Sequence, residues 1–95
     1  PITEDIILRI FDIHLRKLVK LLKAQGIQLE LTKEAKKNIA MAGFNPTFGA
    51  RPLIGEIRSQ LSRPISKMII RGEVKAGNTL QVGLNEKREL TWDTK

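Results

Sequence analysis

The segment that divides this chain into its elements is GFNPTFGARPL, residues 43–53. Gly43 can end a helix, and the dipeptide Asn45-Pro46 is typical of a turn. Pro52 suits the first position of a new helix, because the backbone N–H that proline lacks has no helical partner there. The segment therefore predicts a loop between two helices, and the other elements follow outward from it.

Upstream of this loop, residues 4–24 predict one long helix. Thr3 can cap its start, and Glu4 and Asp5 lie in the first turn, where the helix dipole favours negative charge. Apolar residues recur at helical spacing on more than one face, whereas a small domain needs only one buried face per helix. We therefore expect either a second surface that docks elsewhere or a domain that wraps this helix on both sides. The stripe expected to face the core is Ile7, Ile10, Phe11, His14, Leu18, Leu21 and Leu22, widened by Leu8, Leu15 and Val19, and Ile6 and Ile13 extend the apolar surface further.

Two more elements separate the long helix from the loop. Gly26 is expected to end the helix in a left-handed conformation, and residues 27–31 alternate apolar and polar like a half-buried strand. Thr32 can then cap a second helix, which Gly43 ends. The expected inward positions of that helix are Ala35, Ile39 and Ala42.

Downstream of the loop, the sequence predicts two helices and a hairpin. Apolar residues at every fourth position follow Pro52, and Pro64 is expected to start a separate helix, because proline disrupts a helix interior. Gly72 ends that helix, and residues 80–84 and 90–92 alternate as the strands of a hairpin. The predicted order is helix, strand, helix, helix, helix, hairpin, which is an α+β domain with four helices and a small three-stranded sheet.

The composition fits one small folded domain. A chain of 95 residues with 41% apolar and 28% charged residues can build one core and is too short for two. The absence of Cys excludes a disulfide framework and a thiol nucleophile, and one His leaves no ordinary zinc site. No apolar run is long enough to span a membrane, and no signal peptide is evident. We expect residues 1–95 to be a single domain, cut from a longer cytoplasmic protein, with no metal and no membrane partner.

The net charge of +7 favours nucleic acid at first sight. Residues 32–71 hold eight basic and two acidic side chains, whereas the segments on either side of them are nearly balanced. A nucleic-acid module would also need exposed aromatic side chains for stacking, and aromatics make up only 4% of this chain. We therefore expect no nucleic-acid partner. A small basic nucleic-acid-binding module, tested by salt-dependent binding, and a stand-alone protein-interaction domain are the two alternatives.

The sequence offers no complete catalytic set. His14 lies on a helix stripe, and no glycine-rich loop followed by Lys-Ser or Lys-Thr is present to hold a phosphate. Arg51 stands at a helix start beside the small residues Gly49 and Ala50, where its guanidinium and free backbone N–H groups could meet an anion. This is half of an anion site, and the alternative is an exposed Arg on a solvated turn. The fragment by itself is therefore not expected to be an enzyme.

Residues 43–46 (GFNP) and 48–53 (FGARPL) closely resemble the sensor-2 segment of Clp-type AAA+ unfoldases. That pattern is usually written Gly-Tyr-Asp-Pro followed by Gly-Ala-Arg-Pro-Leu. The resemblance covers nearly the whole chain in order, and its closest type is the C-terminal small domain of the second ATPase module in ClpB-like proteins. The further matching segments are residues 1–3 (PIT), 27–32 (IQLELT), 64–66 (PIS) and 72–77 (GEVKAG).

The resemblance implies a role within a larger ATPase. In such proteins ATP lies between this small domain and a large domain, which also holds Mg²⁺. The residue matching Arg51 reaches the terminal phosphates, with Gly49 and Ala50 beside it, and Ile10 is the candidate for an apolar contact near the adenine. The implied partners are the chain's own large ATPase domain, the neighbouring subunits of a homo-hexamer, and a polypeptide substrate that the parent unfolds or remodels.

The chain departs from the family's usual pattern just after the Pro-Leu pair. Family members commonly have basic residues there and a Gln-Arg further on, whereas this chain has Ile54 and Gly55, then Arg58 and Ser59. These positions lie outside the phosphate contact and leave the expected role of Arg51 unchanged. They leave open whether the parent is a housekeeping disaggregase, a protease-linked unfoldase or a relative that recycles the contractile sheath of type VI secretion.

Overall fold

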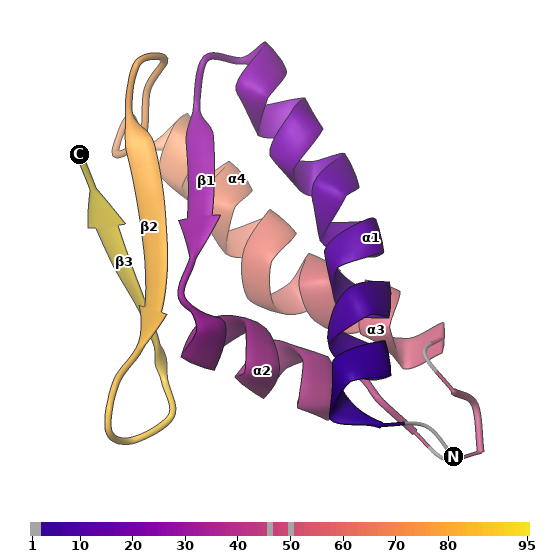
Figure 1. The fold of residues 1–95 in the computed structure, drawn as a ribbon. Coiled ribbons are helices and arrows are strands. Elements are labelled where there is room, and N and C mark those ends of the chain that lie inside the picture. Colours follow the sequence, from indigo (N-terminus) through magenta and orange to yellow (C-terminus); the bar gives the residue numbers. More distant parts are fainter. Residues whose placement is uncertain (1–2, 46, 50) are drawn as a thin grey trace.

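The computed structural model describes residues 3–45, 47–49 and 51–95, and it has the expected α+β class. Figure 1 shows α4 behind a small sheet, α1 beside the sheet and α2 across one end of it. The elements are α1 (Glu4–Ala24), β1 (Gln28–Leu31), α2 (Lys33–Ala42), α3 (Arg51–Ile57), the π-helical segment η1 (Arg58–Ser62), α4 (Arg63–Ile70), β2 (Thr79–Leu84) and β3 (Leu90–Thr94).

Local signals set the ends of the first two helices as predicted. The Thr3 side chain accepts a hydrogen bond from the Ile6 N–H (3.4 Å), and the Thr32 side chain accepts one from the Ala35 N–H (3.1 Å). Each bond pairs a backbone donor that the first turn of a helix leaves without a partner. Gly26 follows α1 with a φ of 80°, which is the left-handed conformation that glycine adopts without strain.

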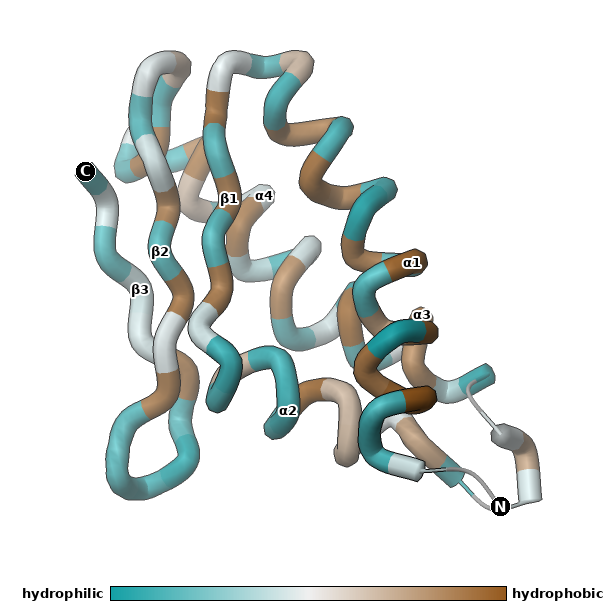
Figure 2. Tube along the Cα trace, viewed as in Figure 1, coloured by the Kyte–Doolittle hydropathy of each residue, from teal (hydrophilic) through white to brown (hydrophobic). Residues whose placement is uncertain are grey.

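The sheet has the strand order β1-β2-β3. β1 runs parallel to β2, with Leu29 opposite Leu80, and β2 runs antiparallel to β3, with Val82 opposite Trp92. Apolar and polar residues alternate along β1 and β2, as Figure 2 shows, so one face of the sheet joins the core and the other carries polar side chains.

A single buried cluster connects every helix to the sheet. Its largest fully buried side chains come from α1, α2, the segment from α3 to α4, β2 and the connection between α4 and β2, so the two halves of the chain share one core. The buried residues are Ile7, Phe11, Leu15, Leu22, Ile27, Leu29, Ala35, Ile39, Ala40, Leu53, Ile57, Leu61, Ile65, Val74, Leu80 and Val82.

The prediction of four separate helices is wrong in one respect. α3, η1 and α4 follow one another without an interruption, so the helices of the described residues form three rods in place of four. Pro64 does not start a new helix after a break: Ser62 and Arg63 both keep right-handed helical dihedral angles. The wide turn before Pro64 explains this, because the Arg63 N–H donates to the Arg58 carbonyl, five residues back. That spacing relieves the clash between a proline ring and the carbonyl four residues earlier.

The wide turn also keeps the apolar side of this rod in one direction. Leu53, Ile57, Leu61 and Ile65 are all buried at intervals of four residues. In an α-helix of 3.6 residues per turn, each interval of four would rotate the next side chain by about 40°. A π-helical turn holds more residues and rotates the chain back, so all four side chains reach the same core.

In α2, the buried positions differ from the prediction at the last turn. Ala35 and Ile39 are buried as expected, but Ala42 is exposed and Ala40 is buried in its place. Ala40 and Gly43 lie three residues apart, on one side of the helix, and that side is where α3 packs. Contacts with a distant segment therefore decide which alanine is covered.

Two basic residues of α2 pair with acidic residues of α1. The Lys36 Nζ lies 3.4 Å from an Asp12 carboxylate oxygen, and the Lys37 Nζ lies 3.2 Å from a Glu4 carboxylate oxygen. Both pairs are partly exposed to solvent, so each adds little to stability. These two pairs nevertheless give part of the positive charge of residues 32–71 an acidic partner within the fold itself.

Candidate functional site

The loop that presents Arg51 is built around the side chain of Asn45. Its Oδ1 accepts hydrogen bonds from the backbone N–H groups of Thr47 (2.7 Å) and Phe48 (3.1 Å). Asn45 and Gly49 also exchange two backbone hydrogen bonds, of 3.0 and 2.6 Å. These bonds close the loop into a tight turn, which agrees with the turn predicted at Asn45. The neighbouring Pro46 lies outside the described residues.

Arg51 is the first residue of α3, and its side chain is exposed. Its backbone N–H donates to the Phe48 carbonyl (3.4 Å), which joins the helix start to the turn. The ion pairs among the described residues do not include Arg51. Its guanidinium thus keeps its donors available for a ligand or a second protein surface.

Gly49 leaves open space next to this helix start. Its φ is 66°, a left-handed conformation, and a Cβ added there would meet no atom within 4 Å. The backbone is therefore accessible beside Arg51. Ala50, which the sequence places between these two residues in the predicted site, lies outside the described residues.

Gly43 has a packing role that the sequence did not predict. It ends α2 with a φ of −90°, so no left-handed conformation requires a glycine there. A Cβ at this position would lie 2.7 Å from both the Cα and the Cδ1 of Leu53, which is too close for any side chain. Gly43 thus allows α3 to pack against the end of α2, and this packing holds the start of α3 in place. The glycine itself was the only signal in the sequence.

Ile10 lies on α1, half-buried against the core. Its neighbours on the outer side of the helix, Ile6 and Ile13, are 42% and 57% exposed. The assignment of Ile10 to a nucleotide contact stays a prediction.

A groove runs between α1 and the start of the third rod, with a volume of about 200 Å³. Its apolar wall includes Leu21 and Ile54, which are 61% and 47% exposed, and its basic rim includes Lys17 and Arg58. The prediction that Leu21 faces the core is therefore wrong, because its neighbour Leu22 takes the buried position. The expectation of apolar surface on α1 beyond the core face is confirmed by the exposed side chains of Ile6 and Ile13. The other residues of the groove are His14, Leu18, Ile57 and Ser62.

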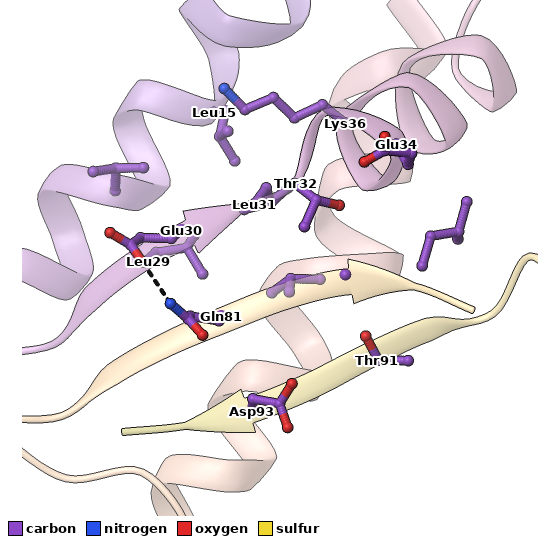
Figure 3. Close-up of a pocket in the computed structure, with 14 residues that line it drawn as sticks. Leu15, Leu29, Glu30, Leu31, Thr32, Glu34, Lys36, Gln81, Thr91 and Asp93 are labelled. Atoms are coloured by element: carbon purple, nitrogen blue, oxygen red, sulfur yellow. Dashed lines mark hydrogen bonds between the residues drawn. The ribbon is translucent and has the colours of Figure 1, made fainter.

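A second, wider hollow lies over the polar face of the sheet, away from the Arg51 loop. Figure 3 shows Glu30, Gln81 and Asp93 on its floor, one from each strand, with a hydrogen bond from Gln81 Nε2 to Glu30 Oε1 (3.0 Å). Its remaining polar lining is mixed in charge, and none of the predicted site residues takes part in it. The described residues also contain no group of three or more His, Cys, Asp or Glu side chains that could hold a metal ion. No helix in the described part of the chain is long and apolar enough to cross a membrane.

Comparison with known families tests the resemblance that the sequence of the Arg51 loop indicated. Residues 2–82 match the model of the C-terminal, D2-small domain, of ClpB protein. The chain belongs to this family. The resemblance to a ClpB small domain, based on residues 43–53, is thereby confirmed, and with it the assignment to the Clp chaperones of the AAA+ class.

Several ClpB chaperones are similar to this chain over most of its length. The chaperone protein ClpB of Aquifex aeolicus is 40% identical over 82 residues, which are 86% of this chain and 8% of that protein. The corresponding protein of Rickettsia felis is 42% identical over 81 residues, covering 85% and 9%. A probable chaperone protein ClpB 1 of Chlorobaculum tepidum is 34% identical over 84 residues, covering 88% and 19%. The chain thus spans between about a tenth and a fifth of the ClpB proteins that it matches.

Proposed function

We propose that this chain is the nucleotide-sensing lid of a hexameric, ATP-hydrolysing Clp-type chaperone that unfolds or remodels polypeptides in the cytoplasm. The observation that carries the proposal is the exposed Arg51 at the start of α3, held by the Asn45 turn and without an ion-pair partner among the described residues. Membership of the ClpB small-domain family supports the same role.

In this proposal Arg51 contacts the terminal phosphates of ATP. Its planar guanidinium can donate two parallel hydrogen bonds to phosphate oxygens, and open backbone at Gly49 leaves room for them. Ala50, between these two residues in the sequence, is proposed as part of the same site. Ile10 is the proposed apolar neighbour of the adenine. ATP bound with Mg²⁺ supplies the phosphoryl group that is transferred to water. The rest of the site, including the Mg²⁺ ligands, belongs to the parent's large domain.

The exposed apolar residues are the proposed contact with the rest of the parent. Ile13, Leu21 and Ile54 form apolar surface next to basic side chains, and such a surface suits a protein partner with apolar and acidic side chains. We propose that this surface packs on the chain's own large domain and on a neighbouring subunit. Movement of the lid would then transmit the nucleotide state around a homo-hexameric ring.

The test is the substitution Arg51→Ala in the full-length parent. We expect the rate of ATP hydrolysis to fall by about 10²-fold, because a charge that stabilises the transferred phosphoryl group is lost. Arg51→Lys should recover only part of the rate, since Lys lacks the planar pair of donors. The melting temperature of the 95-residue chain should barely change, because the side chain is exposed.

The matched control is Arg71→Ala, an exposed arginine just after α4, which should leave hydrolysis unchanged. Equal hydrolysis by the Arg51→Ala and unmodified parents would refute the sensor role. A second measurement is calorimetry of ATP with the 95-residue chain alone. Tight binding there would contradict the conclusion that these residues supply only half of the site.

A further inference from the structure

β3 is an edge strand whose outer side has no partner among the described residues. Thr79 and Lys95, at one end of the β2–β3 ladder, exchange two backbone hydrogen bonds of 2.9 and 2.7 Å. Doubly bonded pairs alternate with non-bonded pairs along an antiparallel ladder. The backbone N–H and C=O groups of Leu90, Trp92 and Thr94 therefore point away from β2, and no other backbone hydrogen bond among the described residues uses them.

β3 lacks most of the features that keep an edge strand from pairing, and Asp93 is its one charged residue. Leu90–Thr94 contains no proline and no lysine, and its register with β2 runs without a bulge. The opposite edge of the sheet differs, because α1 packs against β1 there. Figure 1 shows β3 as the outermost strand, on the side of the sheet away from α1. An unprotected strand of this kind is a template for another strand.

We propose that β3 pairs with β3 of a second copy of this chain, antiparallel and with a two-fold axis at Trp92. The outward groups of Trp92 would then bond to those of the second Trp92, and Leu90 would pair with Thr94 of the second copy. The two three-stranded sheets become one continuous sheet. The proposal involves no nucleotide and is independent of the proposed function.

Charge on the polar face selects this register. Glu89, Thr91, Asp93 and Lys95 alternate with the outward-bonding residues and share one face of the sheet. With Trp92 at the axis, each Glu89 lies opposite a Lys95, and each Thr91 lies opposite an Asp93. If one β3 slides by two residues along the other, one direction places Asp93 opposite Asp93 of the second copy. The other direction places Glu89 opposite Asp93. Like charges directly opposite each other are destabilising, so of these three registers only the Trp92-centred one avoids them.

The other face of the pairing brings the two indole rings together. Trp92 is only half-buried in the single chain, and it is the one tryptophan of the sequence. Residues directly opposite each other on neighbouring strands lie close enough for their side chains to pack, and aromatic pairs are favourable there. Pairing would cover the part of each indole that a single chain leaves exposed, and tryptophan fluorescence would report it.

The first test compares Thr94→Pro with Thr94→Ala in sedimentation equilibrium up to about 1 mM, because so small an interface is expected to bind weakly. Proline removes the outward N–H without removing a bond to β2, whereas alanine keeps that N–H. We expect the unmodified chain and Thr94→Ala to dimerise with similar dissociation constants, and Thr94→Pro to bind at least about tenfold more weakly. Circular dichroism verifies that both variants are folded. A chain that stays monomeric, or a Thr94→Pro variant that dimerises equally well, overturns the proposal.

The second test exchanges the charges. Lys95→Glu and Glu89→Lys should each weaken dimerisation by about tenfold, since each change sets like charges opposite each other twice in a symmetric pair. The double variant should restore the original dissociation constant and the concentration-dependent fluorescence of Trp92. A double variant no better than the single ones would exclude this register, and unaltered single variants would place the contact elsewhere, such as on the exposed residues of α1.

Discussion

At the residue scale, the Arg51 loop depends on two small features that hold it in place. Asn45 pairs two backbone N–H groups that would otherwise face solvent, and Gly43 lets Leu53 approach the end of α2. The sequence pattern identified Gly43 as the end of a helix and Asn45 as part of a turn. Only the structure shows that Gly43 is required by close packing and not by its own dihedral angles, because Leu53 lies ten residues further along the chain.

This difference predicts opposite effects of two glycine-to-alanine changes. Gly43→Ala should destabilise the fold by about 1–3 kcal/mol, because the new methyl group would lie 2.7 Å from the Leu53 backbone. Gly55→Ala adds its methyl group in open space within a helix and should stabilise by up to about 1 kcal/mol. Urea denaturation of the two variants measures both values. A Gly43→Ala variant as stable as the unmodified chain would show that α3 does not pack so closely on α2.

At the scale of elements, capping and periodicity act over a few residues and were predictable. The strand at 27–31, the helix cap at Thr32 and the hairpin all agree with the structure to within a few residues. The continuous third rod was not predictable from Pro64 alone. A proline predicts a helix boundary through its clash with the fourth residue before it, whereas a π-turn removes that clash without a break.

The cap of α2 gives a prediction at this scale. Thr32→Ala should destabilise by about 1 kcal/mol, since the Ala35 N–H loses its acceptor and α2 connects the sheet to the loop. For a domain of this size that corresponds to a fall in melting temperature of about 4–8 °C. Thr32→Ser keeps the hydroxyl group and is the matched control. Thermal denaturation in which the serine variant loses as much as the alanine variant would assign the effect to the lost methyl group instead of the cap.

At the scale of the whole molecule, the apolar surface of α1 exceeds what the core uses. The same helix buries Phe11 fully and leaves Ile13 and Leu21 more than half exposed. The sequence predicted surplus apolar surface but assigned Leu21 to the core. Helical periodicity alone cannot distinguish the two leucines at positions 21 and 22, because each lies close to the edge of the apolar stripe and the packing of other elements decides between them.

Because this surface is exposed in the single chain, a substitution there should affect subunit assembly and leave folding stability nearly unchanged. Leu21→Gln should change the stability of the 95-residue chain by less than about 0.5 kcal/mol, since the side chain is 61% exposed. In the full-length parent the same change should weaken subunit assembly, which sedimentation velocity measures. Ile70→Gln, at an 84% exposed position at the end of α4, is the control and should affect neither property. Intact assembly with Leu21→Gln would remove this surface from the proposed contact.

The sequence by itself determined the nature of the elements, their caps, the loop that carries Arg51, and membership of the ClpB small-domain family. These follow from interactions between residues close in the chain and from a motif read in order. Tertiary structure alone decided that Ala40 replaces Ala42 in the core, that Leu21 stays outside it, that Gly43 lets Leu53 pack closely, and that β3 is an edge strand of the sheet in the described part of the chain. Each of these depends on which distant segment packs at a given place, and no local pattern records that choice.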